Sequence, residues 1–180
     1  MIVASSSINA LLISDTHLGA GQAEQLLGKI GAQLALADVV FHAGDMTDPS
    51  LLTEIARYAP VHAVLGNNDR GMLLPQRLQV DLGGCSVAMV HDSGDAVGRT
   101  QRLRRWFPTA DVVVFGHSHM PWNVADVDPA GVSAGVSAGV SVQHHVNPGS
   151  AMQRRRQPRC TIGWLQIENG SVRSITIDPV

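Results

Sequence analysis

The sequence has little of what marks a secreted or membrane-spanning protein. Its two cysteines, Cys85 and Cys160, lie far apart and form no Cys-x-x-Cys pair. We expect buried thiols in a reducing compartment, with a disulfide between them as the alternative. No apolar run approaches the roughly 20 residues of a membrane helix, and residues 1–7 lack the basic and long apolar regions of a signal peptide. These absences predict a soluble, cytoplasmic protein with no membrane partner.

Charge of one sign and aromatic side chains are also scarce. The 13 lysine and arginine residues nearly balance the 15 aspartate and glutamate residues, and many of the basic ones gather in two local clusters, 99–105 and 154–159. Salt-sensitive binding to nucleic acid requires a basic groove, so neither a nucleic-acid partner nor a nuclease is predicted. With 44% hydrophobic but 4% aromatic residues, the core should consist of aliphatic side chains. A chain of 180 residues suits a single domain spanning 1–180.

Five short apolar runs each lead to a residue that can bind a metal ion. Such a run, bounded by polar residues, is typical of a buried strand, and open α/β sheets place their sites beyond the carboxyl ends of strands. The polar residues after the five runs are Asp15 with His17, Asp45, Asn67, His91, and His117 with His119. One tetrahedral ion takes about four ligands. The larger set therefore predicts two ions, about 3.5–4 Å apart, that share a carboxylate.

The remaining pattern predicts a mixed α/β fold. Strands are expected at 8–14, 38–43, 61–65, 78–82, 85–90, 112–115, 122–127, 140–146, 161–167 and 172–177. Amphipathic helices are expected at 22–37, 51–58 and 98–107, the last with Arg99, Arg102, Arg104 and Arg105 on its outer face. Early strands alternate with helices, and late strands form hairpins. We therefore predict an α/β sandwich of two stacked sheets covered by helices.

A low-complexity repeat interrupts the first late hairpin. Gly-Val-Ser occurs three times, starting at Gly131, Gly135 and Gly139. Glycine and serine with little charge predict a flexible loop at about 129–140, and an extension of the hairpin is the alternative. We assign no chemistry to this segment.

The ordered motifs resemble those of the calcineurin-like metallophosphoesterase superfamily. They are Asp-x-His at 15–17, Gly-Asp at 44–45, Gly-Asn at 66–67, a lone histidine at 91 and Gly-His-x-His at 116–119. The resemblance covers about residues 8–177. The compact size, Gly-Asn-Asn-Asp at 66–69 and Asn-Pro-Gly-Ser at 147–150 are most similar to the small prokaryotic YfcE-type phosphodiesterase branch.

This resemblance implies a four-layer αββα sandwich, with two mixed β-sheets stacked at its centre, and a metal-dependent phosphodiesterase that hydrolyses P–O ester bonds. By position, one ion would be held by Asp15, His17, Asp45 and His119, and the other by Asp45, Asn67, His91 and His117. A hydroxide bridging the two divalent ions would attack the phosphorus of a small phosphodiester substrate. Imidazole and carboxylate ligands without thiolates suit Mn, Fe, Co, Ni or Zn, and Mn is the ion we expect.

One position departs from the family's usual pattern. Most members have a histidine after Gly-Asn, which protonates the leaving group and is held by the following aspartate. Here that position is Asn68, and Asp69 is retained. Asn68 can donate a hydrogen bond to a phosphoryl oxygen but has no titrating proton. General-acid catalysis contributes about 10²–10⁴-fold, so we expect a preference for activated esters, with Asn68 and Asp69 as the catalytic candidates.

Several polar residues allow two interpretations. The arginine cluster at 154–159 is either a solvated face or, through Arg154, a clamp on the substrate phosphate, because arginine binds phosphate through two hydrogen bonds. His42 and His62 are expected in the core, with contact to the ligand residues as the alternative for His42. His144 and His145 alternate along a strand, so at most one of them faces the site.

A second class of function is a protein-interaction scaffold without strong catalysis. A eukaryotic retromer subunit resembles this fold and acts through protein contacts, whereas the near-complete ligand set favours an enzyme. The sequence determines neither the natural substrate nor whether copies of the chain form a homo-oligomer.

Overall fold

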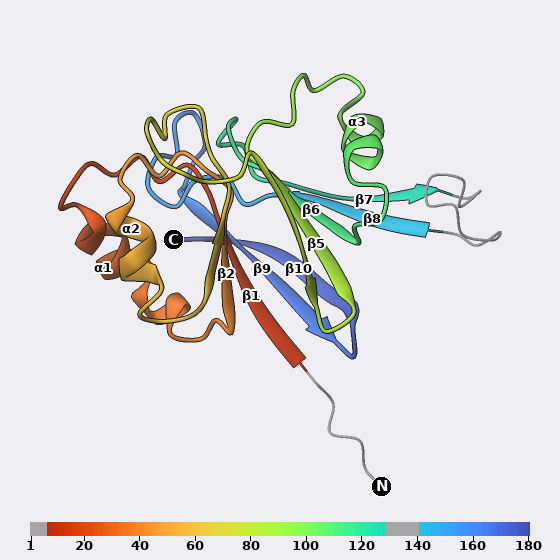
Figure 1. The fold of residues 1–180 in the computed structure, drawn as a ribbon, viewed down its shortest axis with the longest axis horizontal. Coiled ribbons are helices and arrows are strands. Elements are labelled where there is room, and N and C mark those ends of the chain that lie inside the picture. The colour runs from red at the N-terminus through yellow and green to blue at the C-terminus, as the bar shows by residue number, and fades with distance from the viewer. Residues whose placement is uncertain (1–6, 129–140) are drawn as a thin grey trace, which may run out of the picture.

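The computed structural model describes residues 7–128 and 141–180, so the predicted flexible loop at 129–140 lies outside the described residues. Within them the chain forms two five-stranded sheets (Figure 1). The first, in the order β10-β9-β1-β2-β3, contains β1 (Ser7–Ile13), β2 (Val39–His42), β3 (Val61–Ala63), β9 (Thr161–Glu168) and β10 (Ser171–Pro179). The second, in the order β4-β5-β6-β8-β7, contains β4 (Arg77–Leu82), β5 (Cys85–Val90), β6 (Val112–Val114), β7 (Trp122–Asp128) and β8 (Ser141–Asn147).

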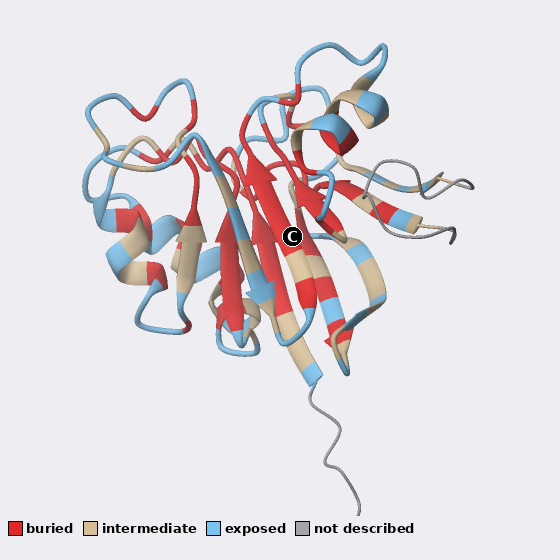
Figure 2. Cartoon of the chain, turned by 45° about the vertical axis from the view of Figure 1, so that its right-hand side comes forward, coloured by how far each residue is buried: buried red, intermediate tan, exposed pale blue. Residues whose placement is uncertain are grey.

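Three apolar cores separate four layers. Successive residues of a strand point to opposite faces of the sheet, and Leu11 and Leu12 of β1 accordingly enter different cores. Leu11 packs in the core beneath α1 (Ala23–Leu34) and α2 (Ser50–Ile55), whereas Leu12 packs between the two sheets with Met89 of β5. Leu103 of α3 (Arg99–Trp106) belongs to the third core, on the outer face of the second sheet. The order helix, sheet, sheet, helix confirms the predicted αββα sandwich, and Figure 2 shows the buried residues concentrated in its strands.

Parallel pairing brings the strand ends that precede the predicted ligand residues to one edge of the molecule. In the first sheet β1, β2 and β3 are parallel neighbours, and in the second β5, β6 and β8 are. Because parallel strands end on the same side, the loops that follow them meet at that edge, which is where sites of α/β sheets form. Glycine-containing hairpins close other strand pairs, including β9 and β10 across Asn169-Gly170, where both residues have positive φ as a type I′ turn requires.

All three helices differ from the prediction, and α2 ends at Ile55 rather than at Tyr58. Helix α1 ends at Leu34 rather than at Ala37, because the Leu36 amide bonds to Gln33 and tightens the last turn. The expected outer face of α3 is wrong for three of its arginines, including Arg99, whose Nε is buried and whose guanidinium lies over the ring of Phe115. Arg104 is buried and pairs with Asp126, and the Arg102 guanidinium bonds to backbone carbonyls of the 93–97 loop. No helix within 7–128 and 141–180 is long and apolar enough to cross a membrane.

The Arg104 pair fixes α3 to the edge strand β7. The Arg104 Nε donates to Asp126 Oδ2 at 2.8 Å, and another guanidinium nitrogen donates to the Asp126 carbonyl at 2.7 Å. Replacing Arg104 by alanine should lower the free energy of unfolding by about 3 kcal/mol, the lower end for breaking a buried pair, because Asp126 keeps some solvent contact. Urea unfolding followed by circular dichroism measures this. The exposed neighbour Arg105→Ala is the control and should change stability by less than about 0.5 kcal/mol.

Candidate metal centre

The predicted ligands occupy the loops that follow β1, β2, β3, β5 and β6. Those with a left-handed backbone are Asp15, His17, Asp45, His117 and His119, with φ between 47° and 67°. For a residue with a Cβ, this backbone conformation costs about 1–3 kcal/mol, and such strain is common at functional sites. It turns the chain sharply after each strand, so that the five side chains lie near one another at the strand ends.

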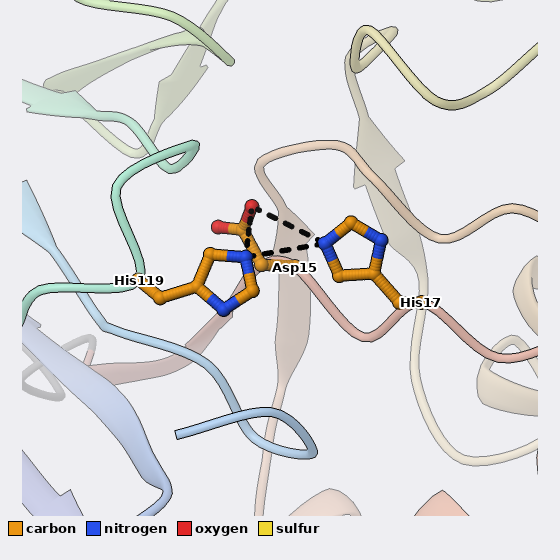
Figure 3. Close-up of side chains that lie close together, drawn as sticks. All are labelled: Asp15, His17 and His119. Atoms are coloured by element: carbon orange, nitrogen blue, oxygen red, sulfur yellow. Dashed lines mark hydrogen bonds and ion pairs between the residues drawn. The ribbon is translucent and has the colours of Figure 1, made fainter. Parts of the chain in front are cut away.

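The first group consists of Asp15, His17 and His119 (Figure 3). Asp15 Oδ1 lies 3.3 Å from His119 Nε2 and 3.9 Å from His17 Nε2, and the two ring nitrogens are 3.2 Å apart. The other carboxylate oxygen accepts hydrogen bonds from the Ser14 hydroxyl and the His117 amide. Asp15 Oδ1 is buried and accepts no hydrogen bond from any described residue. A buried, unbonded carboxylate oxygen facing two imidazole nitrogens fits a cation between them.

The second group consists of Asn67, His91 and His117, from three different loops. Asn67 Oδ1 lies 3.0 Å from His91 Nε2 and 2.9 Å from His117 Nδ1. Asp45 Oδ2 lies 3.4 Å from His91 Nε2 and also 3.6 Å from His17 Nε2 of the first group. One oxygen of Asp45 therefore stands between both groups, as a bridging ligand would.

Backbone carbonyls fix which nitrogen of two imidazoles can face a cation. His119 Nδ1 lies 2.7 Å from the Gln153 carbonyl, and His91 Nδ1 lies 2.7 Å from the Ala43 carbonyl. A carbonyl only accepts, so each Nδ1 carries the hydrogen, and in the neutral ring the lone pair is on Nε2. Both Nε2 atoms face the carboxylates. This is the arrangement by which outer hydrogen bonds orient metal-binding histidines.

The electrostatics of the centre favour a positive charge between the carboxylates. Burial would raise the pKa of Asp45, but hydrogen bonds from His91 and Asn68 outweigh it and hold the pKa well below its usual range. Burial would likewise lower the pKa of His91, yet Asp45 and Asp15 raise it. Carboxylates that stabilise a proton at His91 Nε2 would also stabilise a divalent cation there. Burial lowers the pKa of His17, which keeps its nitrogen lone pair available at neutral pH.

Asp69 does not reach the reacting centre and instead holds two ligand loops together. One of its oxygens accepts hydrogen bonds from the amides of Asp45 and Gly66, and the other from the amide of Thr47, all at 2.8 Å. These three bonds occupy the buried carboxylate. Asp69 therefore positions Asp45, and a direct catalytic role for it stays a prediction.

Asn68, the other catalytic candidate, contacts Asp45 directly. Its Nδ2 donates to Asp45 Oδ2 at 2.6 Å, and its backbone amide donates to Asp45 Oδ1 at 2.8 Å. The side chain is exposed, and an amide carries two N–H groups. One N–H thus holds the shared carboxylate, and the second is available to a ligand.

Two supporting residues belong to the Asn-Pro-Gly-Ser motif at 147–150, to whose members the sequence pattern assigned no roles. The Ser150 hydroxyl donates to the Asp15 carbonyl at 2.7 Å, and the Asn147 amide donates to the Gly116 carbonyl at 2.8 Å. Asn147 is the last residue of β8, the sixth strand that ends at this edge, and Ser150 lies in the loop that follows it. Small polar residues directly after buried strands are the sequence signal that could have identified them.

The histidines with two interpretations are also placed. His42 is fully buried, and burial lowers its pKa to about 4, so it is neutral. It accepts a hydrogen bond from the Gly44 amide and contacts the Thr16 hydroxyl at 3.0 Å, which joins the first two ligand loops. The expected core position of His42 is therefore confirmed, and its hydrogen bonds go to neighbours of the ligand residues rather than to the ligands themselves. His145 is buried and contacts Gln143, and no described hydrogen bond joins it to the ligand groups.

The arginine cluster at 154–159 lies on the surface. Arg154 is exposed, and its guanidinium donates to the Gln157 carbonyl of the same loop. This fits the solvated face, and the predicted contact of Arg154 with the substrate phosphate stays a prediction.

Glycine is required at position 66, where the third ligand loop crosses the second. A Cβ at Gly66 would lie 2.2 Å from both the amide nitrogen and Oδ1 of Asp45. Gly66→Ala should therefore displace the shared carboxylate and weaken Mn²⁺ binding at least tenfold, the scale seen when supporting contacts of a metal site are lost. Isothermal titration calorimetry measures the affinity. Gly28→Ala, where a Cβ meets nothing within 4 Å, is the control. Unchanged affinity in a folded Gly66→Ala variant would place the metal elsewhere.

Several solved structures of differently named proteins have the same fold as this chain. A predicted phosphoesterase from Streptococcus pneumoniae superposes with a TM-score of 0.70 at 22% identity, covering 97% of this chain and 90% of that chain. Vacuolar protein sorting 29 from Cryptosporidium parvum superposes with a TM-score of 0.70 at 15% identity, covering 97% and 99%. An archaeal phosphodiesterase gives a TM-score of 0.64 at 19% identity, covering 95% and 100%. At these identities the likeness establishes the architecture alone.

Comparison of the sequence with known proteins also identifies the family. A probable metallophosphoesterase of Methanothermobacter thermautotrophicus is 34% identical over 115 residues, which cover 62% of this chain and 66% of that protein. A second, from Methanocaldococcus jannaschii, is 32% identical over 116 residues, covering 62% and 58%. The match spans less than two thirds of either relative. The model of the calcineurin-like phosphoesterase superfamily domain, however, matches residues 8–170. The chain therefore belongs to the calcineurin-like phosphoesterase superfamily.

Proposed function

We propose that the protein is a phosphodiesterase that uses two divalent metal ions. Membership of the superfamily supports a metal-dependent hydrolase of phosphoester bonds. The finer assignment rests on one observation: Asp45 Oδ2 lies within 3.6 Å of an imidazole nitrogen from each of two ligand groups. This position suits a carboxylate that two ions share, so the arrangement favours two ions over one.

The residues that would hold the ions follow from the two groups. Asp15, His17, His119 and Asp45 would hold the first, and Asn67, His91, His117 and Asp45 the second. When bound, such ions lower the pKa of a coordinated water to about 7 and neutralise charge on the phosphoryl oxygens. Oxygen and imidazole donors without thiolate suit Mn²⁺ and also Fe, Co, Ni and Zn.

The protein's own groups would orient the ester. His91 and His119 are held by backbone carbonyls, so neither ring needs to turn when the substrate binds. The second N–H of Asn68 would donate to a phosphoryl oxygen while the first stays on Asp45. This contact can stabilise charge but transfers no proton. The leaving group would therefore depart without help from position 68.

The interaction-scaffold alternative has a specific basis in the fold. Vacuolar protein sorting 29 structures superpose on nearly the whole chain. The centre described above is nevertheless complete, with Asp15 Oδ1 left for a cation. We therefore favour catalysis, and the scaffold is the outcome supported by firm metal binding without turnover.

A metal and substrate screen tests the proposal. Chelated protein should be inactive, and Mn²⁺ should restore hydrolysis of bis(p-nitrophenyl) phosphate. Asp45→Ala should abolish both that activity and binding of a second Mn²⁺ per chain, because the variant removes the shared oxygen. Asp81→Ala, an exposed carboxylate at the far end of the β4–β5 hairpin, is the matched control. Full activity in Asp45→Ala would contradict the proposal.

The leaving-group dependence tests the role of Asn68. Rates on aryl and alkyl phosphodiesters should fall steeply as the leaving-group pKa rises, because no general acid compensates. In Asn68→His a titrating proton is introduced, and the rate on alkyl esters should rise about tenfold relative to aryl esters. Asn68→Gln, which keeps an amide, should retain the steep dependence. If the rate of the wild type depended on the leaving-group pKa as weakly as that of Asn68→His, another residue would have to protonate the leaving group.

A further inference from the structure

A cavity opens directly beside the second ligand group. It has a volume of about 540 Å³ and lies between the loop after β3, the start of β4 and the end of β5. Two of its lining residues, Asn67 and His91, are members of that ligand group. A substrate whose phosphorus lay at the metal centre could therefore extend into this cavity without crossing any other element. Its volume is typical of small-molecule sites.

The cavity wall carries two arginines and two carboxylates, and the carboxylates are occupied. Both oxygens of Asp69 accept hydrogen bonds from backbone amides. Asp92 accepts a hydrogen bond from the Gly94 amide at 2.7 Å. Asp92 is also exposed, so solvent screens its charge. The negative charges of the wall are thus either hydrogen-bonded or screened by solvent.

The two arginines of the wall are Arg70 and Arg77, and their guanidinium N–H groups have no such hydrogen-bond partners among the described residues. Within residues 7–128 and 141–180, neither Arg70 nor Arg77 forms an ion pair or donates a side-chain hydrogen bond. Arg77 is nevertheless held in place, because its guanidinium stacks at 4.1 Å over the ring of Trp106. Stacking occupies a face of the guanidinium and leaves the N–H donors at its edge free. A pre-positioned guanidinium with free donors suits a carboxylate or phosphate.

We propose that this cavity binds a second anionic group of the substrate, and that Arg70 and Arg77 select phosphodiesters carrying a carboxylate or phosphate beyond the scissile bond. The inference rests on the proposed function, because the phosphorus must first lie at the metal centre. It deepens that function by naming the substrate class: dianionic rather than simple alkyl or aryl diesters. Arg70 and Arg77 are specificity residues, and bond cleavage itself does not depend on them.

Binding of two matched probes to the Mn²⁺-loaded protein tests this. 3-Phosphonopropionate and propylphosphonate share the phosphonate and differ in the carboxylate at the other end. Isothermal titration calorimetry should show about tenfold tighter binding of 3-phosphonopropionate to wild type, the scale of one charged hydrogen bond. Arg77→Gln and Arg70→Gln should each reduce that preference severalfold and leave propylphosphonate binding unchanged. Arg105→Gln, which removes an exposed charge outside the cavity, should retain it.

The outcomes separate the two proposals. If both phosphonates bind equally to wild type, or if the preference survives in both cavity variants, the anionic subsite is wrong and the phosphodiesterase stands. If neither phosphonate binds the loaded protein, the subsite is overturned, and hydrolysis of bis(p-nitrophenyl) phosphate decides separately on the phosphodiesterase. A preference lost equally in Arg105→Gln would reflect net charge and would also overturn the subsite. Arg70 makes no described side-chain contact, so Arg70→Gln remains informative if loss of the Arg77 stacking impairs folding.

Discussion

The structure depends on two buried carboxylates that share a small volume with four imidazoles. Asp15 and Asp45 are almost fully buried, yet neither is paired with a lysine or arginine among the described residues. Buried anions are costly unless a positive charge compensates them. The facing imidazoles compensate this charge only when protonated, a state that the carboxylates favour at His91 by raising its pKa. The centre is therefore built for cations, and the surrounding hydrogen bonds keep its ligands in place.

The fold supplies the rigidity that such a centre requires. Left-handed backbone at five ligand residues is unfavourable locally, and it persists because well-packed strands lie directly beneath each turn. The supporting bonds run between loops rather than within them. Asp69 joins the second and third ligand loops, His42 the first and second, and Ser150 joins the turn after β8 to Asp15. Distortion of one loop is thus transmitted to the ligands of another.

Substrate preference would be set around the centre rather than in it. Position 68 bears an amide that holds Asp45 and would give a poor leaving group no proton. The adjoining cavity carries Arg70 and Arg77 with free donors, which would favour an additional negative charge. Both features leave the metal ligands unchanged. Members of a superfamily can in this way keep one chemistry and differ in the esters they accept.

The sequence by itself determined the sandwich and the set of polar residues that gather at its edge, because apolar runs ending in ligand residues keep their meaning without coordinates. The division of that set between two ions came from the family resemblance and stays a prediction. Tertiary structure decided what depends on neighbours distant in the chain. The burial of Arg104 follows from Asp126 on another strand, and the positioning role of Asp69 from amides of two loops. The Arg77–Trp106 stacking likewise joins separate elements. The local sequence pattern indicates which chemistry a residue is capable of, whereas the packing of elements distant in the chain decides which partner its side chain contacts.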